Sequence, residues 1–196
     1  MPQEDKRIRR TKKLLEESLL TLMRQKKFQT ITIKDLVIEA DMNRGTFYRH
    51  YSDTYDLLNS ISESTLENYT AIINKFDTKN INSLSLVVNE LYDFFRNNHA
   101  KFYCLISIPN PSNFEEHVVN KLYDTSKKFL ININGDIHSS VNHCYMSFIV
   151  SGIIGVLKNS LSNNSHFTKN DISHVMTIML DNATKTLEKN NTLYNK

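Results

Sequence analysis

The chain has few of the residues that interrupt helices. Its 196 residues include only four Gly and three Pro, and two of the prolines, Pro109 and Pro111, stand almost together. Because Gly and Pro end or kink helices, long stretches without them favour helical structure. No segment shows the alternation of apolar and polar residues that indicates a β-strand. We therefore predict an all-α protein.

Cysteine is also scarce. Cys104 and Cys144 lie far apart in the sequence and lack the spacing of a metal site. Such a pair is typical of reduced thiols in a cytosolic protein rather than of a disulfide framework. We therefore expect both thiols to be buried and the protein to be cytoplasmic.

Long apolar segments are missing as well. The N-terminus is charged and does not contain the apolar core of a signal peptide. A membrane-spanning helix needs about 20 predominantly apolar residues, and the longest apolar run, residues 148–157 (FIVSGIIGVL), is too short. We interpret this run as a buried helix and expect no association with a membrane.

Motifs of catalysis and cofactor binding are absent from the sequence. It contains no Gly-rich phosphate loop, no paired carboxylates and no His/Cys ligand set. His99, Cys104 and His117 have a spacing that fits no recognised catalytic or metal site, and ordinary packing explains them better. We predict no catalytic residues, no metal, no cofactor and no enzymatic activity.

The positive charge is unevenly distributed. The net charge is +3, and all of this excess lies in residues 1–58, most of it between Lys6 and Lys13. Residues 59–196 carry equal numbers of basic and acidic side chains. A localised basic patch indicates an anionic partner such as nucleic acid. A solvated basic tail is an alternative that charge alone leaves equally open.

Residues 32–51 (TIKDLVIEADMNRGTFYRHY) have the pattern of a helix-turn-helix. Thr32 is a good N-cap, and Asp35 occupies the third helical position as its capping-box partner. Asp41 tolerates the left-handed conformation that a tight turn needs, and Asn43 can cap a second helix with a basic and aromatic outward face. A helix of this kind can enter the DNA major groove.

The apolar periodicity predicts further helices along the chain. We place them at about 6–27, 54–76, 84–98, 100–107, 112–133, 138–163 and 169–190. Thr168 can cap the last helix, with Asp171 as its partner. Basic residues crowd the first turns of the first helix, which is unfavourable beside a helix N-terminus. Contacts with DNA phosphates would explain them.

Over about residues 7–58 the chain resembles the tetracycline-repressor (TetR) family of bacterial transcriptional regulators. That family favours a small residue, Gly and Val at the turn, then Ser, a basic residue, Gly, Thr, an aromatic residue or Leu, Tyr, two variable residues and Phe. Residues 40–51 read ADMNRGTFYRHY. This chain departs from the pattern at Asp41, which replaces a Gly, at Val37, which replaces an Ala, and at Thr54, which replaces a phosphate-contacting Lys.

The resemblance implies two domains and a function. A DNA-binding domain would span residues 1–58, with the helix-turn-helix at about 32–51, and a helical effector-binding and dimerisation domain would span 59–196. The protein would be a homodimeric repressor that binds a palindromic operator in double-stranded DNA and is released by a small-molecule effector. Residues 148–163 and 167–180 resemble the last two helices of one subgroup, which build its dimer interface.

The resemblance also implies roles for individual residues. Phosphate contacts would come mainly from Thr32, Asn43, Thr46 and Tyr48, with more general anchors at Lys6, Arg7, Arg9 and Arg10. Base reading would fall to Arg44 and to Arg49 or His50, although helix packing or a phosphate contact is equally open for His50. Gly45 near the start of the second helix would let the backbone approach DNA closely.

Two more sets of residues follow for the second domain. The candidates for an effector pocket are large side chains, Phe95, Phe102, Tyr103, Phe114 and Tyr123, and plain core packing is the alternative for each of them. The candidates for the dimer interface are Phe148, Gly152, Gly155, Val156, Met176 and Leu180, and packing within their own subunit is the alternative.

Two other functions stay open at this point. The first is a TetR-like regulator or activator that is controlled by a protein partner rather than by a small molecule. The second is a helical interaction protein that does not bind DNA and whose basic N-terminus is incidental.

Overall fold

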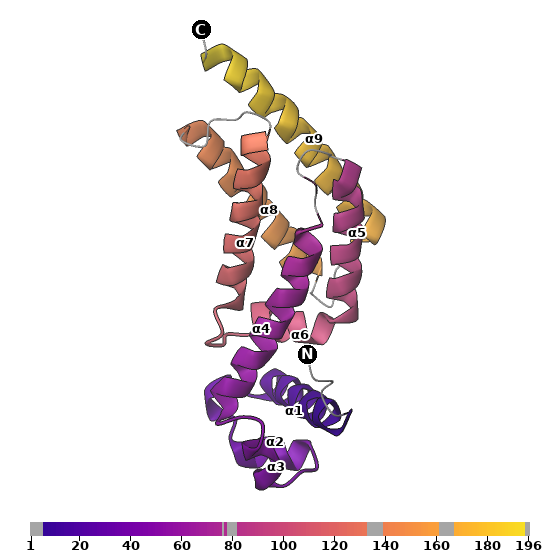
Figure 1. The fold of residues 1–196 in the computed structure, drawn as a ribbon, viewed down its shortest axis with the longest axis vertical. Helices are drawn as coiled ribbons and strands as arrows, with labels where there is room; N and C mark the ends of the chain where they lie inside the picture. Colours follow the sequence, from indigo (N-terminus) through magenta and orange to yellow (C-terminus); the bar gives the residue numbers. More distant parts are fainter. Residues whose placement is uncertain (1–5, 76, 78–81, 133–138, 161–166, 195–196) are drawn as a thin grey trace. The chain divides into compact units, whose positions relative to one another are not determined.

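The structure is a computed structural model that describes residues 6–75, 77, 82–132, 139–160 and 167–194. Every regular element in these ranges is helical, and they contain no strand (Figure 1). The all-α prediction is confirmed.

The helices follow one another as the apolar periodicity predicts, with small shifts at their ends. In chain order the elements are α1 (Lys6–Gln25), the 3-10 turn η1 (Phe28–Thr30), α2 (Ile33–Glu39), α3 (Arg44–Tyr48), α4 (Thr54–Ile73), α5 (Asn82–Asn97), α6 (His99–Phe102), the π-helical turn η2 (Tyr103–Ser107), α7 (Phe114–Asn132), α8 (Ser140–Ser160) and α9 (Lys169–Tyr194).

The helix predicted at about 100–107 differs from the prediction, because it is divided into α6 and the π-helical turn η2. Pro109 follows this turn and has no N–H with which to continue the helix. The Asn110 side-chain amide instead donates to the carbonyl oxygens of Cys104 at 3.0 Å and Ile108 at 2.7 Å. These bonds satisfy carbonyl groups that the end of a helix leaves without partners.

The chain forms two compact units. The first comprises Met1–Leu66 together with Ala100–Phe114, and the second comprises Glu67–His99 and Glu115–Lys196. The core of the first unit contains the apolar face of α1, including Leu15 and Leu19, and large side chains from later elements. Phe28 is one of these, and its ring meets Tyr55 of α4 edge-on, with 5.0 Å between the ring centroids.

The segment Ala100–Phe114 packs against α1 within the first unit. The Lys101 Nζ lies 2.6 Å from the Glu16 carboxylate, and the Cys104 thiol donates to the Leu20 carbonyl oxygen at 3.5 Å. Burial raises the pKa of the Cys104 thiol to about 11, so this thiol stays protonated. A domain boundary at residue 58 stays a prediction.

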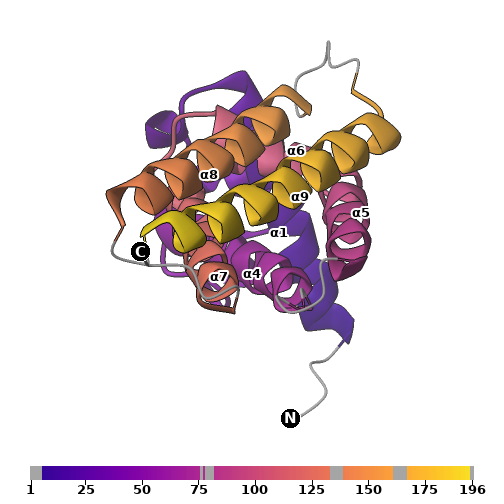
Figure 2. The same cartoon turned by 90° about the horizontal axis from the view of Figure 1, so that it is seen from above.

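In the second unit, α9 packs against both α5 and α8 (Figure 2). A small core forms where Val88 of α5 meets Ile172 of α9. The N-terminus of α9 has the predicted cap, since the Thr168 hydroxyl and backbone N–H both donate to the Asp171 carboxylate, at 2.7 and 2.9 Å. This prediction is confirmed.

Two expectations about burial are wrong, and both concern α8. Cys104 is buried as expected, whereas Cys144 on α8 is exposed. The apolar run 148–157 is only partly buried, because Phe148 is 62% exposed while Ile149 and Val150 lie in the core. The α9 helix covers one side of α8 and leaves an apolar side open.

The complete α8 helix is longer than the apolar run 148–157, which was judged too short to span a membrane. Among the described residues, α8 is long and apolar enough to cross a membrane by its length and composition alone, and most of it is not buried. Core helices of globular proteins pass the same criterion, so the finding alone does not indicate a membrane protein.

Candidate nucleic-acid interface

The N-terminus of α2 is held by the predicted capping box. The Thr32 hydroxyl oxygen accepts from the Asp35 N–H at 3.2 Å, and the Thr32 N–H donates to the Asp35 carboxylate at 2.8 Å. The Thr32 hydroxyl proton is also donated to this carboxylate, at 2.7 Å. Thr32 is exposed, but it can donate its hydroxyl to a DNA phosphate only by giving up this last bond.

Lys26 completes the cap from the end of α1. Its Nζ lies 2.7 Å from the Asp35 carboxylate. The hydrogen bonds from Lys26 and then from Thr32 hold the pKa of the Asp35 carboxyl far below its usual range. Asp35 is therefore ionised near neutral pH, and it fixes the start of α2 relative to α1.

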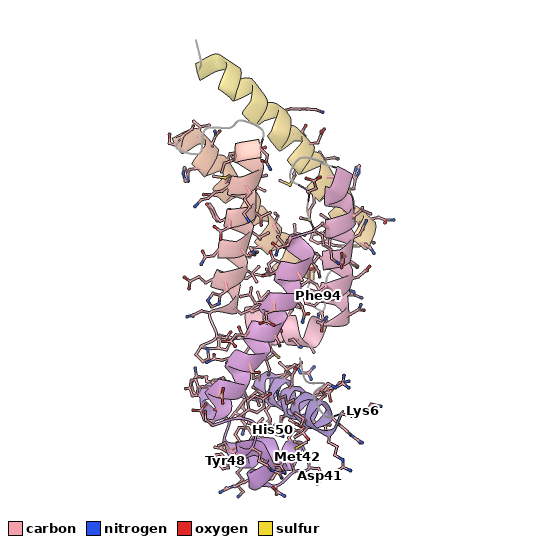
Figure 3. The ribbon with its side chains drawn as sticks, in the orientation of Figure 1. Lys6, Asp41, Met42, Tyr48, His50 and Phe94 are labelled. Carbon is pink, nitrogen blue, oxygen red and sulfur yellow. The ribbon has the colours of Figure 1, made fainter. Side chains whose placement is uncertain are left out.

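The turn between α2 and α3 has a left-handed residue at the predicted position. Asp41 has a φ of 51°. Its N–H donates to the Ile38 carbonyl at 3.2 Å, and the Met42 N–H donates to the Val37 carbonyl at 2.8 Å. These two bonds form a Schellman motif, in which the residue after the C-cap is left-handed. The prediction for Asp41 is confirmed, and Figure 3 labels Asp41 and Met42 at this turn.

A side-chain cap also starts α3, as predicted. The Asn43 side-chain oxygen accepts from the Thr46 N–H at 2.8 Å and from the Thr46 hydroxyl at 3.1 Å. A Cβ placed on Gly45 would lie 3.3 Å from this same oxygen. Gly45 thus leaves room for the cap, a local role that the sequence pattern did not reveal.

The remaining residues of α3 and its end divide into inward and outward positions. Phe47 is fully buried, whereas Tyr48 is 58% exposed, and its ring lies edge-on to that of Phe47. Tyr48 is labelled in Figure 3. Arg44 is exposed at the first position of the helix. His50 is half-buried, with its ring 6.5 Å from the ring of Tyr51.

Arg49 is folded back along α3. Its Nε donates to the Gly45 carbonyl at 3.4 Å, and its Nη2 donates to the Thr46 hydroxyl at 3.3 Å. Both distances are long for hydrogen bonds, so the guanidinium is held weakly and can turn outward at small cost.

The start of α1 presents its basic residues to solvent. Lys6, Arg7, Arg9 and Arg10 are all exposed, and the first turn contains no acidic residue. The local field of the helix N-terminus does not favour these cations. They form a positive patch at the start of α1.

The structure divides the predicted effector residues between the two units. Phe102 and Phe114 are buried in the first unit, where their rings meet 5.7 Å apart, and Tyr103 is half-buried there. Phe95 lies in the second unit beside Tyr69, with ring centroids 6.3 Å apart. Tyr123, also in the second unit, shares a hydrogen bond with Ser147 of α8.

The predicted dimer residues have two different surroundings. Phe148 and Gly155 are exposed, and a Cβ placed on Gly152 or Gly155 would meet no atom within 4 Å. Val156 and Met176 instead pack against the core formed by Val88 and Ile172. The side chain of Leu180 lies outside the described residues.

Three further apolar residues of α8 and α9 are exposed and were not singled out from the sequence, namely Val141, Val175 and Ile178. Val141 precedes Phe148 by seven residues, and Val175 precedes Ile178 by three, so each pair lies on one helical face. This spacing was the signal that could have identified them. In the described ranges, no group of three or more His, Cys, Asp or Glu could hold a metal ion.

Comparison with known proteins identifies a family. The family model described as "Transcriptional regulator C-terminal region", of the TetR type, matches residues 82–182. The curated "Uncharacterized HTH-type transcriptional regulator YxbF" of Bacillus subtilis (strain 168) is 23% identical over 163 residues, which are 79% of this chain. This chain spans only 40% of the length of that relative.

Several solved structures have a similar fold. A TetR transcriptional regulator from Streptococcus agalactiae 2603V gives a TM-score of 0.62 at 20% identity, covering 90% of this chain and 96% of that one. The dihydroxyacetone kinase operon activator DhaS gives 0.54 at 17% identity, covering 91% and 96%. The TetR family regulator PfmR from Thermus thermophilus gives 0.56 at 15% identity, covering 86% and 92%.

At these identities the solved structures establish the fold and nothing further. The family match is a separate finding, which spans half of the chain and lies wholly C-terminal to the helix-turn-helix. Together with the capped α2–turn–α3 arrangement, these findings show that the chain belongs to the TetR family of transcriptional regulators.

Proposed function

We propose that the protein is a homodimeric repressor that binds a palindromic operator in double-stranded DNA and leaves it when a small effector binds. The observation that carries this proposal is the outward face of α3. Arg44 and Tyr48 point away from a core that is anchored by the buried Phe47. A regulator of this bacterial family meets DNA in the cytoplasm, so we include a cytoplasmic location in the proposal.

The exposed groups suit two kinds of DNA contact. Hydroxyl groups of Thr46 and Tyr48 and the cations of α1, Arg7 and Arg10 among them, can bind phosphate oxygens, which supply most of the affinity and make it depend on salt. Arg44 can read a guanine edge with two hydrogen bonds. Arg49 can join it after releasing its weak bonds to Gly45 and Thr46.

Other residues of the interface act mainly on its geometry. Asn43 and Thr32 hold the N-termini of α3 and α2 by capping, and their additional phosphate contacts are part of the proposal. Gly45 leaves room for the Asn43 cap and for a nearby DNA backbone. We assign His50 to helix packing or to a phosphate contact rather than to base reading, since its ring lies near that of Tyr51.

The open apolar side of α8 and α9 supports pairing of two chains. Val141 and Phe148 on α8 and Val175 and Ile178 on α9 are exposed, and Gly152 and Gly155 leave space for a partner helix. Contiguous exposed apolar surface marks interaction sites. A two-fold dimer reads two half-sites that lie about one helical turn or a multiple of it apart, which requires a palindromic operator.

Effector control requires a route from the second unit to the DNA-reading unit. Two chain segments link the units: α4, which begins in the first unit and continues into the second, and Ala100–Phe114, which belongs to the first unit and lies in the sequence between the two parts of the second. The second segment holds α1 through the Lys101–Glu16 ion pair. A ligand that favours one position of this segment would shift the fraction of molecules whose first unit can bind DNA. The large side chains predicted for a pocket, such as Phe95 and Tyr123, belong to this part of the proposal.

One experiment tests both DNA binding and whether the protein represses or activates transcription. DhaS, which shares the fold, is an operon activator, so activation is the second outcome to examine. The experiment is selection of bound sequences from random DNA by the full chain, followed by a reporter gene behind the selected site. An enriched palindrome and lower reporter expression support the proposal. Enrichment of a single half-site contradicts dimeric reading, and absence of any enriched sequence contradicts sequence-specific binding.

A further inference from the structure

Tyr69 has a buried hydroxyl group that the fold does not use. The residue lies on α4 in the second unit and is 2% exposed. Among the described residues, its hydroxyl has no hydrogen-bond partner. Its ring lies beside Phe95 of α5, with 6.3 Å between centroids, and Phe95 in turn lies 6.0 Å from Phe94, which Figure 3 labels.

Two other buried hydroxyl groups among the described residues have partners on their own helices. The Thr65 hydroxyl donates to the Ile61 carbonyl at 2.6 Å, and the Ser18 hydroxyl donates to the Leu14 carbonyl at 2.8 Å. Short side chains can reach the carbonyl groups of their own helix in this way. The Tyr69 hydroxyl stands at the far end of an aromatic ring, so its partner must come from outside its own helical turn. Burying it without one is unfavourable.

The buried residues that the structure describes restrict the chemistry of such a partner. The buried residues that the structure describes include no Asp, Glu, Lys, Arg or His. An ionised ligand group in the interior of the second unit would therefore have no buried countercharge, which is strongly unfavourable. Burial also raises the pKa of the Tyr69 hydroxyl, so the group stays protonated and is available as a donor.

We propose that the Tyr69 hydroxyl is the polar anchor of a buried ligand site in the second unit, and that the ligand is a neutral, largely apolar molecule with a hydrogen-bond-accepting oxygen. The aromatic rings of Phe95 and Phe94 belong to the same side-chain cluster. A ketone, an ester or an alcohol on an apolar frame fits this description. The inference rests on the proposed effector control and names the chemical class of the effector.

The test uses the full chain and three probes of matched size: acetophenone, a neutral ketone; ethylbenzene, which lacks oxygen; and benzoate, an anion. Dissociation constants are measured by calorimetry or by ligand-observed NMR. We expect wild type to bind acetophenone most tightly and benzoate most weakly. Tyr69→Phe should weaken acetophenone binding roughly tenfold, the effect of losing one hydrogen bond in a desolvated site, and leave ethylbenzene binding unchanged.

Thermal unfolding without a probe tests independently whether the Tyr69 hydroxyl lacks a partner. Tyr69→Phe removes an unpartnered buried hydroxyl, so its melting temperature should equal or exceed that of wild type. The matched control is Tyr55→Phe, which changes an exposed tyrosine of the first unit and should alter neither stability nor probe binding. A lower melting temperature for Tyr69→Phe would show that the hydroxyl already has a partner, such as an ordered water, and would overturn the proposal.

Three binding results would also overturn it: no binding of any probe, benzoate binding as tight as acetophenone binding, or equal acetophenone affinity in Tyr69→Phe and wild type. Other results would contradict the proposed function without contradicting the Tyr69 site. If wild type binds acetophenone through Tyr69 but keeps its selected DNA site, effector release is contradicted and the Tyr69 site stands. If the chain selects no DNA sequence, the probe titrations on the protein alone still decide the Tyr69 site.

Discussion

Substitution of Asp41 tests the turn that joins α2 to α3. Asp41 is exposed and has a φ of 51°, and its N–H and that of Met42 close the C-terminus of α2 with bonds of 3.2 and 2.8 Å. A left-handed residue other than Gly costs about 1–2 kcal/mol, and Asp is at the lower end of this range because its short polar side chain tolerates the conformation. The exposed side chain adds little else to stability.

The expected magnitudes follow from this backbone geometry. Asp41→Gly removes about 1 kcal/mol of strain but loses roughly 0.4–1 kcal/mol through the larger freedom of Gly in the unfolded chain. The variant should thus be as stable as wild type or more stable by about 0.5 kcal/mol. Asp41→Ala retains the strain without a polar side chain, so we expect it to be less stable than Asp41→Gly by about 1 kcal/mol.

The assay is thermal unfolding of both variants beside wild type, followed by titration with the selected DNA. For a chain of this size, 1 kcal/mol corresponds to a shift in melting temperature of roughly 2–4 °C. Asp41→Gly should also retain full DNA affinity, since the turn keeps its hydrogen bonds. Equal stability of the Ala and Gly variants would refute the reasoning, because a turn that does not need a left-handed residue would not distinguish them.

Further predictions concern DNA, pairing and pH. Tyr48→Phe should weaken binding to all DNA sequences about tenfold without changing the salt slope, since it removes a neutral phosphate donor; Arg44→Ala should instead relax base preference at one position of each half-site. Phe148→Glu should make the protein monomeric in sedimentation experiments, whereas Leu86→Glu, also at an exposed apolar residue, should stay dimeric. Asp35 has a lowered pKa in the folded state, so its stabilisation is complete above its unfolded pKa, near 4, and is lost as pH falls further. The stability difference between wild type and Asp35→Asn should therefore shrink below about pH 4 in acid-unfolding curves, and a constant difference would contradict this.

Local features of the fold could be predicted from sequence because they depend on neighbouring residues. The caps at Thr32, Asn43 and Thr168 join side chains to backbone groups three residues away, so residue type and spacing suffice to identify them. The left-handed Asp41 could be predicted for a similar reason, since few residue types tolerate that conformation. The number and order of the long helices followed from their apolar periodicity.

Contacts between distant segments could not be predicted in the same way. Periodicity indicates which residues share a face of a helix, but not which other helix covers that face. Met176 is an example: it packs against Val88 and Ile172 of its own chain, and its prediction as a dimer residue stays a prediction. Cys144 was expected to be buried from cysteine usage alone, which carries no information about which helix covers it. The packing of Ala100–Phe114 against α1 depends on residues more than 80 positions apart, such as Cys104 and Leu20.

The candidate DNA site also has features that the sequence predicts and features that only the structure shows. The sequence pattern identified the outward residues of α3, but the uses of its inward and capping residues needed the structure. A helix as short as Arg44–Tyr48 is not stable by its own propensity, so its order must come from the Asn43 cap and the buried Phe47. Because the outward Arg44 contributes little to that order, it can change without loss of the fold, whereas Tyr48 also places its ring edge-on to Phe47.

Gly45 differs from the outward residues of α3, because it affects both the order of the helix and its approach to DNA. A side chain at Gly45 would press on the Asn43 oxygen from 3.3 Å, so it would disturb the cap that orders α3 as well as any close approach to DNA. A change at Arg44, or the substitution Tyr48→Phe, should therefore alter DNA binding alone. A side chain at Gly45 should alter stability as well, by an amount set by how far the Asn43 side chain must shift to make room for it.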